Sequence, residues 1–78
     1  MIEVFKTNVN EQHHAEALIQ KIQHEFDHYH ANFDLQDCDN ILRIKSSHNT
    51  IQSFAVIEIL NKAGFDAEIL KETLQTVL

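Results

Sequence analysis

The 78-residue sequence contains no proline, no tryptophan, one glycine and one cysteine. Because the lone Cys38 cannot form a disulfide within the chain, the fold must be stabilised by packing, which is typical of a cytoplasmic protein. No run approaches the roughly 18 apolar residues that a membrane helix needs, and the first residues lack the pattern of a signal peptide. With loop-forming residues so scarce, we expect nearly all of the chain to be regular secondary structure.

Positive charge is scarce as well. Six Lys and Arg residues against twelve Asp and Glu residues give a net charge of −6 at pH 7, which disfavours nucleic acid and anionic membranes as partners. A chain of this length makes one small domain and buries only about 60% of its unfolded surface. The abundant residue is histidine, with six copies, and histidine is the commonest metal ligand among side chains.

The apolar periodicity predicts six elements in the order strand, helix, strand, strand, helix, strand. Strands are expected at residues 2–7, 29–36, 41–45 and 65–70, and helices at about 11–26 and 50–63. Two similar halves of this kind are typical of the ferredoxin-like βαββαβ sandwich, an α+β fold with a four-stranded antiparallel sheet and both helices on one face. Residues 1–70 make up this domain. Residues 71–78 form a tail in which three apolar residues have the spacing of a helical turn: Leu74, Val77 and Leu78.

The two middle strands are expected to form a hairpin. Apolar and polar residues alternate along both, as in a sheet with one buried face. If the turn places Asp37 opposite Asn40, the resulting pairs are Leu35 with Leu42, Phe33 with Ile44, and Asp34 with Arg43. The first two pairs face inward and the third, of opposite charge, faces outward, so both faces are consistent with this register.

Capping residues mark the expected helix ends. Asn8 and Asn10 are N-cap candidates for the first helix, and Asn49 with Gln52 resembles a capping box at the start of the second. Gly64 suits the left-handed position that follows a helix C-terminus.

Several stretches of the chain carry the pattern of a known family. They are Ile2-Glu3-Val4-Phe5-Lys6, Ala17-Leu18 with Ile22, Phe33-Asp34-Leu35, Ile41-Leu42-Arg43-Ile44, Val56, Leu60, and Ala63-Gly64-Phe65-Asp66-Ala67. On these residues the chain resembles the heavy-metal-associated (HMA) domain family of copper chaperones and metal-ATPase modules, over about residues 2–70. The resemblance implies the ferredoxin-like fold and places the family's metal motif, Met-x-Cys-x-x-Cys, on residues 9–14. Both cysteine positions of that motif are changed, to Glu11 and His14.

This change of ligands changes the metal that the loop would prefer. Cu(I) is selected by thiolates, whereas carboxylate and imidazole ligands suit Zn²⁺, Ni²⁺ or Cu²⁺. In this topology the loop before the first helix and the hairpin turn lie at the same end of the sheet, which brings together up to four donors for a tetrahedral site. The candidate ligands are Glu11, His13, His14 and Cys38. The alternative is that these side chains are simply solvated at a helix N-terminus.

The remaining histidines are expected at the opposite end of the sheet, as a solvated rim. They are His24, His28, His30 and His48. His24 and His28 have i,i+4 spacing, but His28 is expected beyond the helix end. In the register above, His48 lies opposite Tyr29 and His30 opposite Ser47, so the two point to different faces.

No arrangement of residues supports catalysis. Cys38 is flanked by Asp37 and Asp39, which disfavour a reactive thiolate, and no histidine lies near it in sequence to act as a base. We therefore predict no enzyme activity.

Some apolar residues of the second helix are not explained by a core. An inward stripe is expected from Val56, Ile59, Leu60 and Ala63, whereas Ile51, Phe54 and Ala55 project to the other side. Either the tail covers these three residues, or they form a homodimer or partner surface. The open face of the sheet, with Ile41 and Phe5, is a second candidate surface.

Two hypotheses follow. In the first, the chain is a non-enzymatic HMA-like domain without the copper site that acts as a protein-interaction or dimerisation module. In the alternative, it binds or carries a divalent transition metal ion through Glu11, His13 and His14.

Overall fold

The structure, a computed structural model, describes residues 1–47 and 50–70. The elements along the chain are β1 (Ile2–Thr7), α1 (Gln12–Glu25), β2 (Tyr29–Asp34), β3 (Ile41–Ser46), α2 (Ser53–Lys62) and β4 (Ala67–Ile69). The predicted order of strands and helices is therefore confirmed, although β2 and β4 are shorter than expected. His48, Asn49 and the tail that carries Leu74, Val77 and Leu78 lie outside the described residues.

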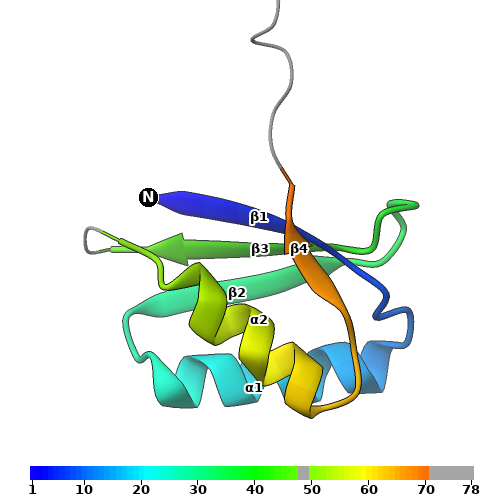
Figure 1. Cartoon of the computed structure of the whole chain (residues 1–78), viewed down its shortest axis with the longest axis horizontal. Helices are drawn as coiled ribbons and strands as arrows, with labels where there is room; N and C mark the ends of the chain where they lie inside the picture. The colour runs from blue at the N-terminus through cyan, green and yellow to red at the C-terminus, as the bar shows by residue number, and fades with distance from the viewer. Residues whose placement is uncertain (48–49, 71–78) are drawn as a thin grey trace, which may run out of the picture.

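The four strands form one antiparallel sheet in the order β2-β3-β1-β4. Figure 1 shows α1 and α2 together on one side of this sheet. The predicted α+β class, with a four-stranded antiparallel sheet and two helices, is confirmed, and the arrangement is compatible with a ferredoxin-like fold. Within the described residues, no helix combines the length and the apolar character that crossing a membrane requires.

The core lies between the sheet and the two helices. It consists of Phe5, Val9, Ala15, Leu18, Ile22, Tyr29, Ala31, Leu42, Ile44, Val56 and Leu60. Phe5 pairs with Leu42 across the β1–β3 ladder, and both side chains are completely buried. The expectation that Phe5 belongs to the open face of the sheet is therefore wrong. β1 has apolar residues at successive positions, so alternation alone does not tell which of them face inward.

The β2–β3 hairpin has a different register from the expected one. The structure pairs Phe33 with Leu42 and Ala31 with Ile44, a shift of two residues. Asp34 consequently lies opposite Ile41, and it reaches Arg43 only diagonally, with 4.0 Å between its Oδ2 and the Arg43 Nη2. A shift of two leaves every side chain on its predicted face, so the faces are predicted correctly and the pairs are not.

The helix N-termini also differ from expectation. Glu11 is the N-cap of α1 and makes no side-chain capping bond, and Gln52 is the N-cap of α2 rather than a residue of its first turn. The Asn8 or Asn10 cap and the Asn49–Gln52 capping box are therefore wrong. The backbone N–H of Gln52 donates to the Tyr29 hydroxyl instead, at 2.7 Å.

The end of α2 follows the predicted pattern. Gly64 has φ +94°, its N–H donates to Asn61 O, and the N–H of Phe65 donates to Leu60 O, which together make a Schellman motif. Ala63, expected in the inward stripe, is the C-cap and is exposed. This sharp ending turns the chain back into β4.

The outer edge of β2 is covered by α1. The Gln23 side chain accepts a hydrogen bond from Ala31 N at 2.9 Å, and the Phe26 carbonyl accepts one from Tyr29 N at 3.0 Å. Two backbone donors that an edge strand would leave open are thereby satisfied.

Candidate metal centre

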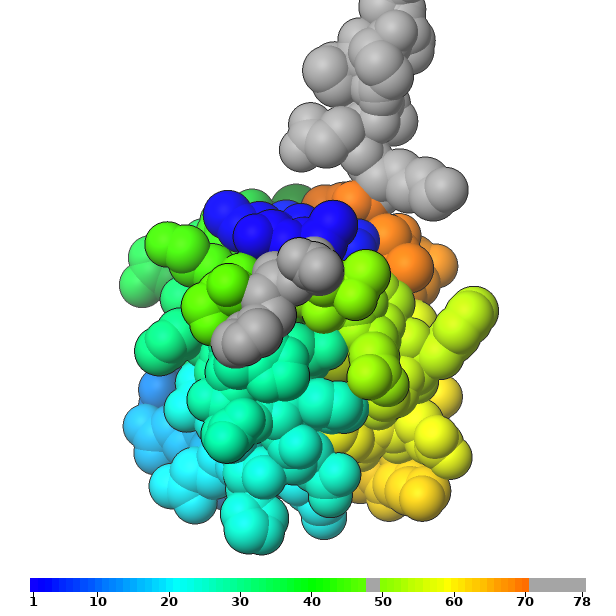
Figure 2. Space-filling view, turned by 90° about the vertical axis from the view of Figure 1, so that its left-hand side faces the viewer, coloured from blue at the N-terminus to red at the C-terminus, as the bar shows by residue number. Residues whose placement is uncertain are grey.

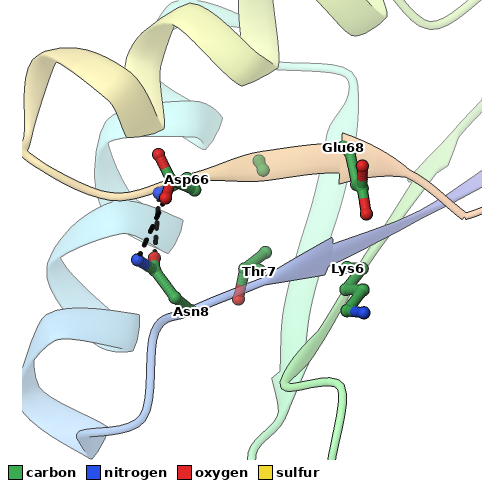
Figure 3. A pocket seen from close by; sticks show the side chains of 6 residues that line it. Lys6, Thr7, Asn8, Asp66 and Glu68 are labelled. Carbon is green, nitrogen blue, oxygen red and sulfur yellow. Dashed lines mark hydrogen bonds between the residues drawn. The ribbon is translucent and has the colours of Figure 1, made fainter.

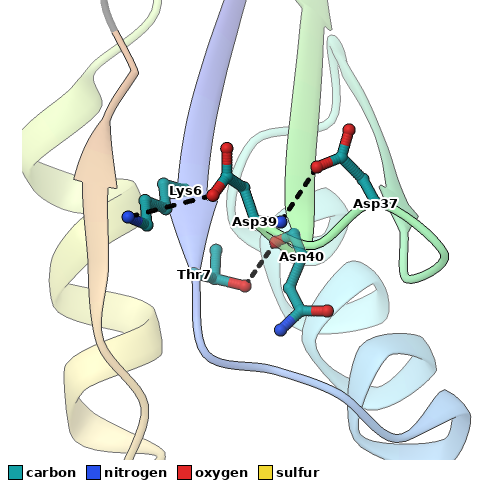
Figure 4. Close-up of polar contacts among 5 residues, drawn as sticks. All are labelled: Lys6, Thr7, Asp37, Asp39 and Asn40. Carbon is teal, nitrogen blue, oxygen red and sulfur yellow. Dashed lines mark hydrogen bonds and ion pairs between the residues drawn. The ribbon is translucent and has the colours of Figure 1, made fainter.

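The loop that leads from β1 into α1 is tied to the hairpin turn through Thr7. The Thr7 hydroxyl donates to Asn40 O at 2.6 Å and accepts a hydrogen bond from Val9 N at 3.1 Å, while Thr7 N donates to Asp39 O at 3.1 Å. Figure 4 shows these groups converging, together with the Lys6–Asp39 ion pair at 3.8 Å. The predicted proximity of this loop and the hairpin turn is confirmed.

The same loop is tied to the start of β4 through Asn8. The Asn8 side chain accepts a hydrogen bond from Asp66 N at 2.8 Å, and its amide lies 3.5 Å from the Asp66 carboxylate. Figure 3 shows this pair beside an open pocket of about 400 Å³ along the paired strands β1 and β4, which Lys6 and Glu68 also line. Val9, the next residue, is completely buried, so the entry to α1 is fixed on both sides.

Three candidate ligands come together on this fixed entry. Glu11, His13 and His14 each offer one ligand atom within 4.8 Å of the others. The Glu11 Oε1 lies 3.5 Å from the His13 Nδ1, and the two imidazole rings lie 4.0 Å apart between centroids. The side chains of Glu11 and His13 are 58% and 71% exposed, so an ion from solvent reaches this site without any opening of the fold.

His14 is held more firmly than the other two ligands. Its ring packs against Phe65 at 5.2 Å, and it lines a pocket of about 340 Å³ with Leu18 and Lys21. Its Nδ1 is buried and has no hydrogen-bond partner within the described part of the chain. Leaving such an atom unpaired costs roughly 1–3 kcal/mol.

Cys38 lies at the same end of the sheet but in a different group. Its Sγ falls within 4.8 Å of carboxylate oxygens of Asp37 and Asp39, and not within the Glu11 group. Asp37 and Asp39 are already engaged, because Asp37 Oδ1 accepts a hydrogen bond from Asp39 N and Asp39 pairs with Lys6. Cys38 itself is an exposed free thiol. The structure therefore brings together three of the four predicted ligands.

The histidines at the opposite end do not converge in the described part of the chain. His24 lies in the last turn of α1, which ends at Glu25, so His28 lies beyond the helix as expected. His28 contacts the edge of Tyr29 and lies 3.6 Å from Asp27, and His30 lies opposite Lys45 rather than Ser47. Tyr29 pairs with Ser46, not with His48.

The predicted interface residues separate in the structure. Phe54 is 86% exposed, whereas Ile51 is half-buried against the core and Ala55 is half-buried at the edge of a groove between the helices. Ile41, on the open face of the sheet, is buried.

Two residues around the site were not anticipated. Phe65 comes from the α2–β4 turn and packs against His14. Lys21 comes from the third turn of α1 and lines the same pocket as His14. No local pattern links Phe65 to His14, because the contact depends on how the two halves of the fold pack.

The chain matches no protein-family model, no curated protein and no solved structure. The donor set and its geometry are therefore the basis for assigning a function.

Proposed function

We propose that this domain binds one divalent transition metal ion through Glu11, His13 and His14. The observation that supports the proposal is that all three donors lie within 4.8 Å of one another on one exposed turn. Ligand atoms around a tetrahedral Zn²⁺ lie roughly 3.3 Å apart, given metal–ligand distances of about 2.0–2.1 Å. The Glu11–His13 distance of 3.5 Å is already close to this value, and we expect side-chain rotations to bring His14 to a similar distance.

The donor types select the metal. One carboxylate and two imidazoles suit Zn²⁺, Ni²⁺ or Cu²⁺ and do not suit Cu(I), which requires softer ligands. Three protein ligands also leave at least one coordination position for water or for a ligand from another molecule. Such an open site exchanges its ion, and we propose a role in metal binding or trafficking rather than in holding the fold together.

The fold gives the proposal a context. We propose that the chain is a ferredoxin-like βαββαβ sandwich related to the HMA domains, in which Glu11 and His14 stand where that family has its two cysteines. The element order and the strand order β2-β3-β1-β4 support the ferredoxin-like part of this proposal. We further propose that the domain is non-enzymatic and acts in the cytoplasm, where its single free thiol, Cys38, would stay reduced.

Calorimetric titration of the metal-free protein with Zn²⁺, Ni²⁺ and Cu²⁺ tests the proposal. We expect one ion per chain with a dissociation constant of about micromolar or below, and loss of binding in the double variant His13→Ala/His14→Ala. The matched control is His24→Ala/His30→Ala, which removes two exposed histidines from the other end and should bind as the wild type does. Absence of binding at micromolar metal, or equal loss in both double variants, would contradict the proposal.

The role of Cys38 is tested in the same titration. Because its Sγ is not part of the Glu11 group, Cys38→Ser should leave the affinity unchanged within about twofold. A tenfold or larger loss would show that the hairpin turn moves to supply a fourth ligand.

A second function, as an interaction or dimerisation module, is favoured by a different observation. Phe54 is 86% exposed, the most exposed large apolar side chain among the described residues.

A further inference from the structure

Phe54 stands on the first turns of α2 and points to solvent. The buried residues of α2 are Val56 and Leu60, which face the sheet. At 100° per residue, Phe54 lies well away from that buried stripe. An exposed phenyl ring gains free energy when another surface covers it, so this side chain is suited to contact another molecule.

A groove runs beside Phe54, between the two helices. It has a volume of about 210 Å³ and an apolar floor of half-buried side chains: Phe26, Ala55 and Ile59. Figure 2 views the molecule from the end where α1 finishes and α2 begins, with the light-blue and cyan atoms of α1 at the lower left and the yellow-green atoms of α2 at the right. Glu58 lies four residues after Phe54, and therefore on the same side of α2, and it lines the groove. The protruding ring thus stands next to the rim of the groove.

The rim of the groove is electrically balanced. It carries two lysines, Lys21 and Lys62, and two glutamates, Glu25 and Glu58, so its charges cancel. The net charge of −6 therefore lies on the rest of the chain. Two copies that approached through other surfaces would generally bring like charges together. Two copies that met through this face would bring together surfaces without net charge.

We propose that the α1–α2 face is the contact surface of a homodimer in which Phe54 of each copy enters the α1–α2 groove of the other. A two-fold interface requires one patch to be complementary to itself. This face meets that requirement in shape, with a ring and an apolar groove side by side, and in charge, with two cations and two anions on the rim.

The rim charges can exchange partners across such an interface. The Lys62 Nζ lies 3.8 Å from the Glu58 carboxylate within one chain, and both side chains are largely exposed. Exposed pairs of this kind contribute little, so either charge is available to a second copy. With one ring per copy as the main anchor, the interface belongs to the small, weakly bound class.

Sedimentation velocity of the full chain, over roughly 1–500 µM and with a chelator present, tests the homodimer. We expect a concentration-dependent dimer with a dissociation constant of about 10–100 µM, and Phe54→Ala should weaken it at least tenfold. The matched control is Ile2→Ala, which removes another exposed side chain, 60% exposed, from the opposite face of the sheet; its dimer should be unchanged.

Charge variants locate the interface independently of Phe54. Lys21→Glu/Lys62→Glu makes the rim wholly negative, and Glu25→Lys/Glu58→Lys makes it wholly positive. Each double variant alone should be monomeric because like charges meet, whereas an equimolar mixture of the two should associate.

Four outcomes would overturn the homodimer. The first is a wild-type monomer at every concentration, as expected if residues 71–78 or an unrelated partner occupy this face instead. The second is a dimer that Phe54→Ala leaves unchanged, and the third is a mixture of charge variants that does not associate. The fourth is a dimer that forms only without the chelator, which would assign association to the metal centre. The first three results do not depend on whether Glu11, His13 and His14 bind metal.

Discussion

At the scale of single residues, Thr7 does more than any other side chain to shape the candidate metal centre. Its hydroxyl donates to the hairpin turn at Asn40 O and accepts from Val9 N, and the side chain is buried. One oxygen therefore satisfies a backbone donor and a backbone acceptor that come from segments more than thirty residues apart. The loop that carries Glu11 depends on this bridge for its course.

Thr7→Val tests the bridge. Valine keeps the shape of threonine but leaves Val9 N buried and unpaired, so we expect a loss of about 1–3 kcal/mol in the free energy of unfolding, measured by urea denaturation. Thr50→Val is the matched control, because Thr50 is exposed and should change stability by less than about 0.5 kcal/mol. Equal effects of the two substitutions would show that the hydroxyl at Thr7 contributes nothing specific.

Single residues also show which local features can be predicted from the sequence and which cannot. Gly64 was predictable, because a positive φ after a helix favours glycine over every other residue, and the structure has φ +94° there. Asn8 was not. Its side chain resembles an N-cap, but it pairs with Asp66, 58 positions away. Local capping patterns carry no information about such distant competitors.

At the scale of elements, the edges of the sheet are treated differently. β4 has only three residues, whereas β2 has six and is the longer edge strand. Gln23 of α1 covers β2 by accepting from Ala31 N. A polar side chain on the helix thus occupies a backbone donor that another strand would otherwise reach.

Gln23→Ala should uncover that edge. We expect Ala31 N–H to exchange with solvent about two- to twelvefold faster, since one hydrogen bond contributes roughly 0.5–1.5 kcal/mol, and we expect more aggregation on prolonged incubation. Hydrogen exchange followed by NMR measures the first effect. Gln20→Ala, at an exposed site of the same helix, should leave the exchange of Ala31 unchanged, and a similar acceleration in both variants would contradict the role of Gln23.

The hairpin shows why elements are easier to predict than their pairing. Alternation at Tyr29, Ala31 and Phe33 fixes the buried face of β2, but a slip of two residues leaves that face unchanged. What selects the observed register is the six-residue turn at 35–40, held by the bonds between Thr7 and the Asp39–Asn40 backbone. These bonds come from β1, so the hairpin sequence alone does not contain them.

The candidate metal centre was likewise predictable from the sequence only in part. Glu11, His13 and His14 are close in sequence at a helix start, so their convergence could be predicted from spacing. The separation of Cys38 from them depends on the tertiary course of the hairpin turn. Contact of His14 with Phe65 depends on the packing of α2 against α1 and was not predictable from either segment.

At the scale of the whole molecule, the histidines couple charge to pH. The net charge is −6 with neutral histidines, so protonating all six would bring it to zero. A net charge near zero promotes association. We expect the solubility, measured by precipitation with polyethylene glycol, to fall as the pH is lowered from 7.5 to about 5.5. A control variant, His24→Gln/His30→Gln, should shift the minimum to lower pH, and a solubility that rises over this range would contradict the prediction.

The position of β1 between β3 and β4 has a consequence for biosynthesis. Phe5 of β1 pairs with Leu42 of β3 on one side and with Ile69 of β4 on the other. Both partners come later in the sequence, so β1 leaves the ribosome before either of its neighbours. A nascent chain therefore carries an unpaired, partly apolar strand until β3 emerges, and one open side of that strand until β4 emerges. Contacts between such distant segments form slowly because long loops must close first. The last few residues of the domain thus control when its first strand is shielded from other chains.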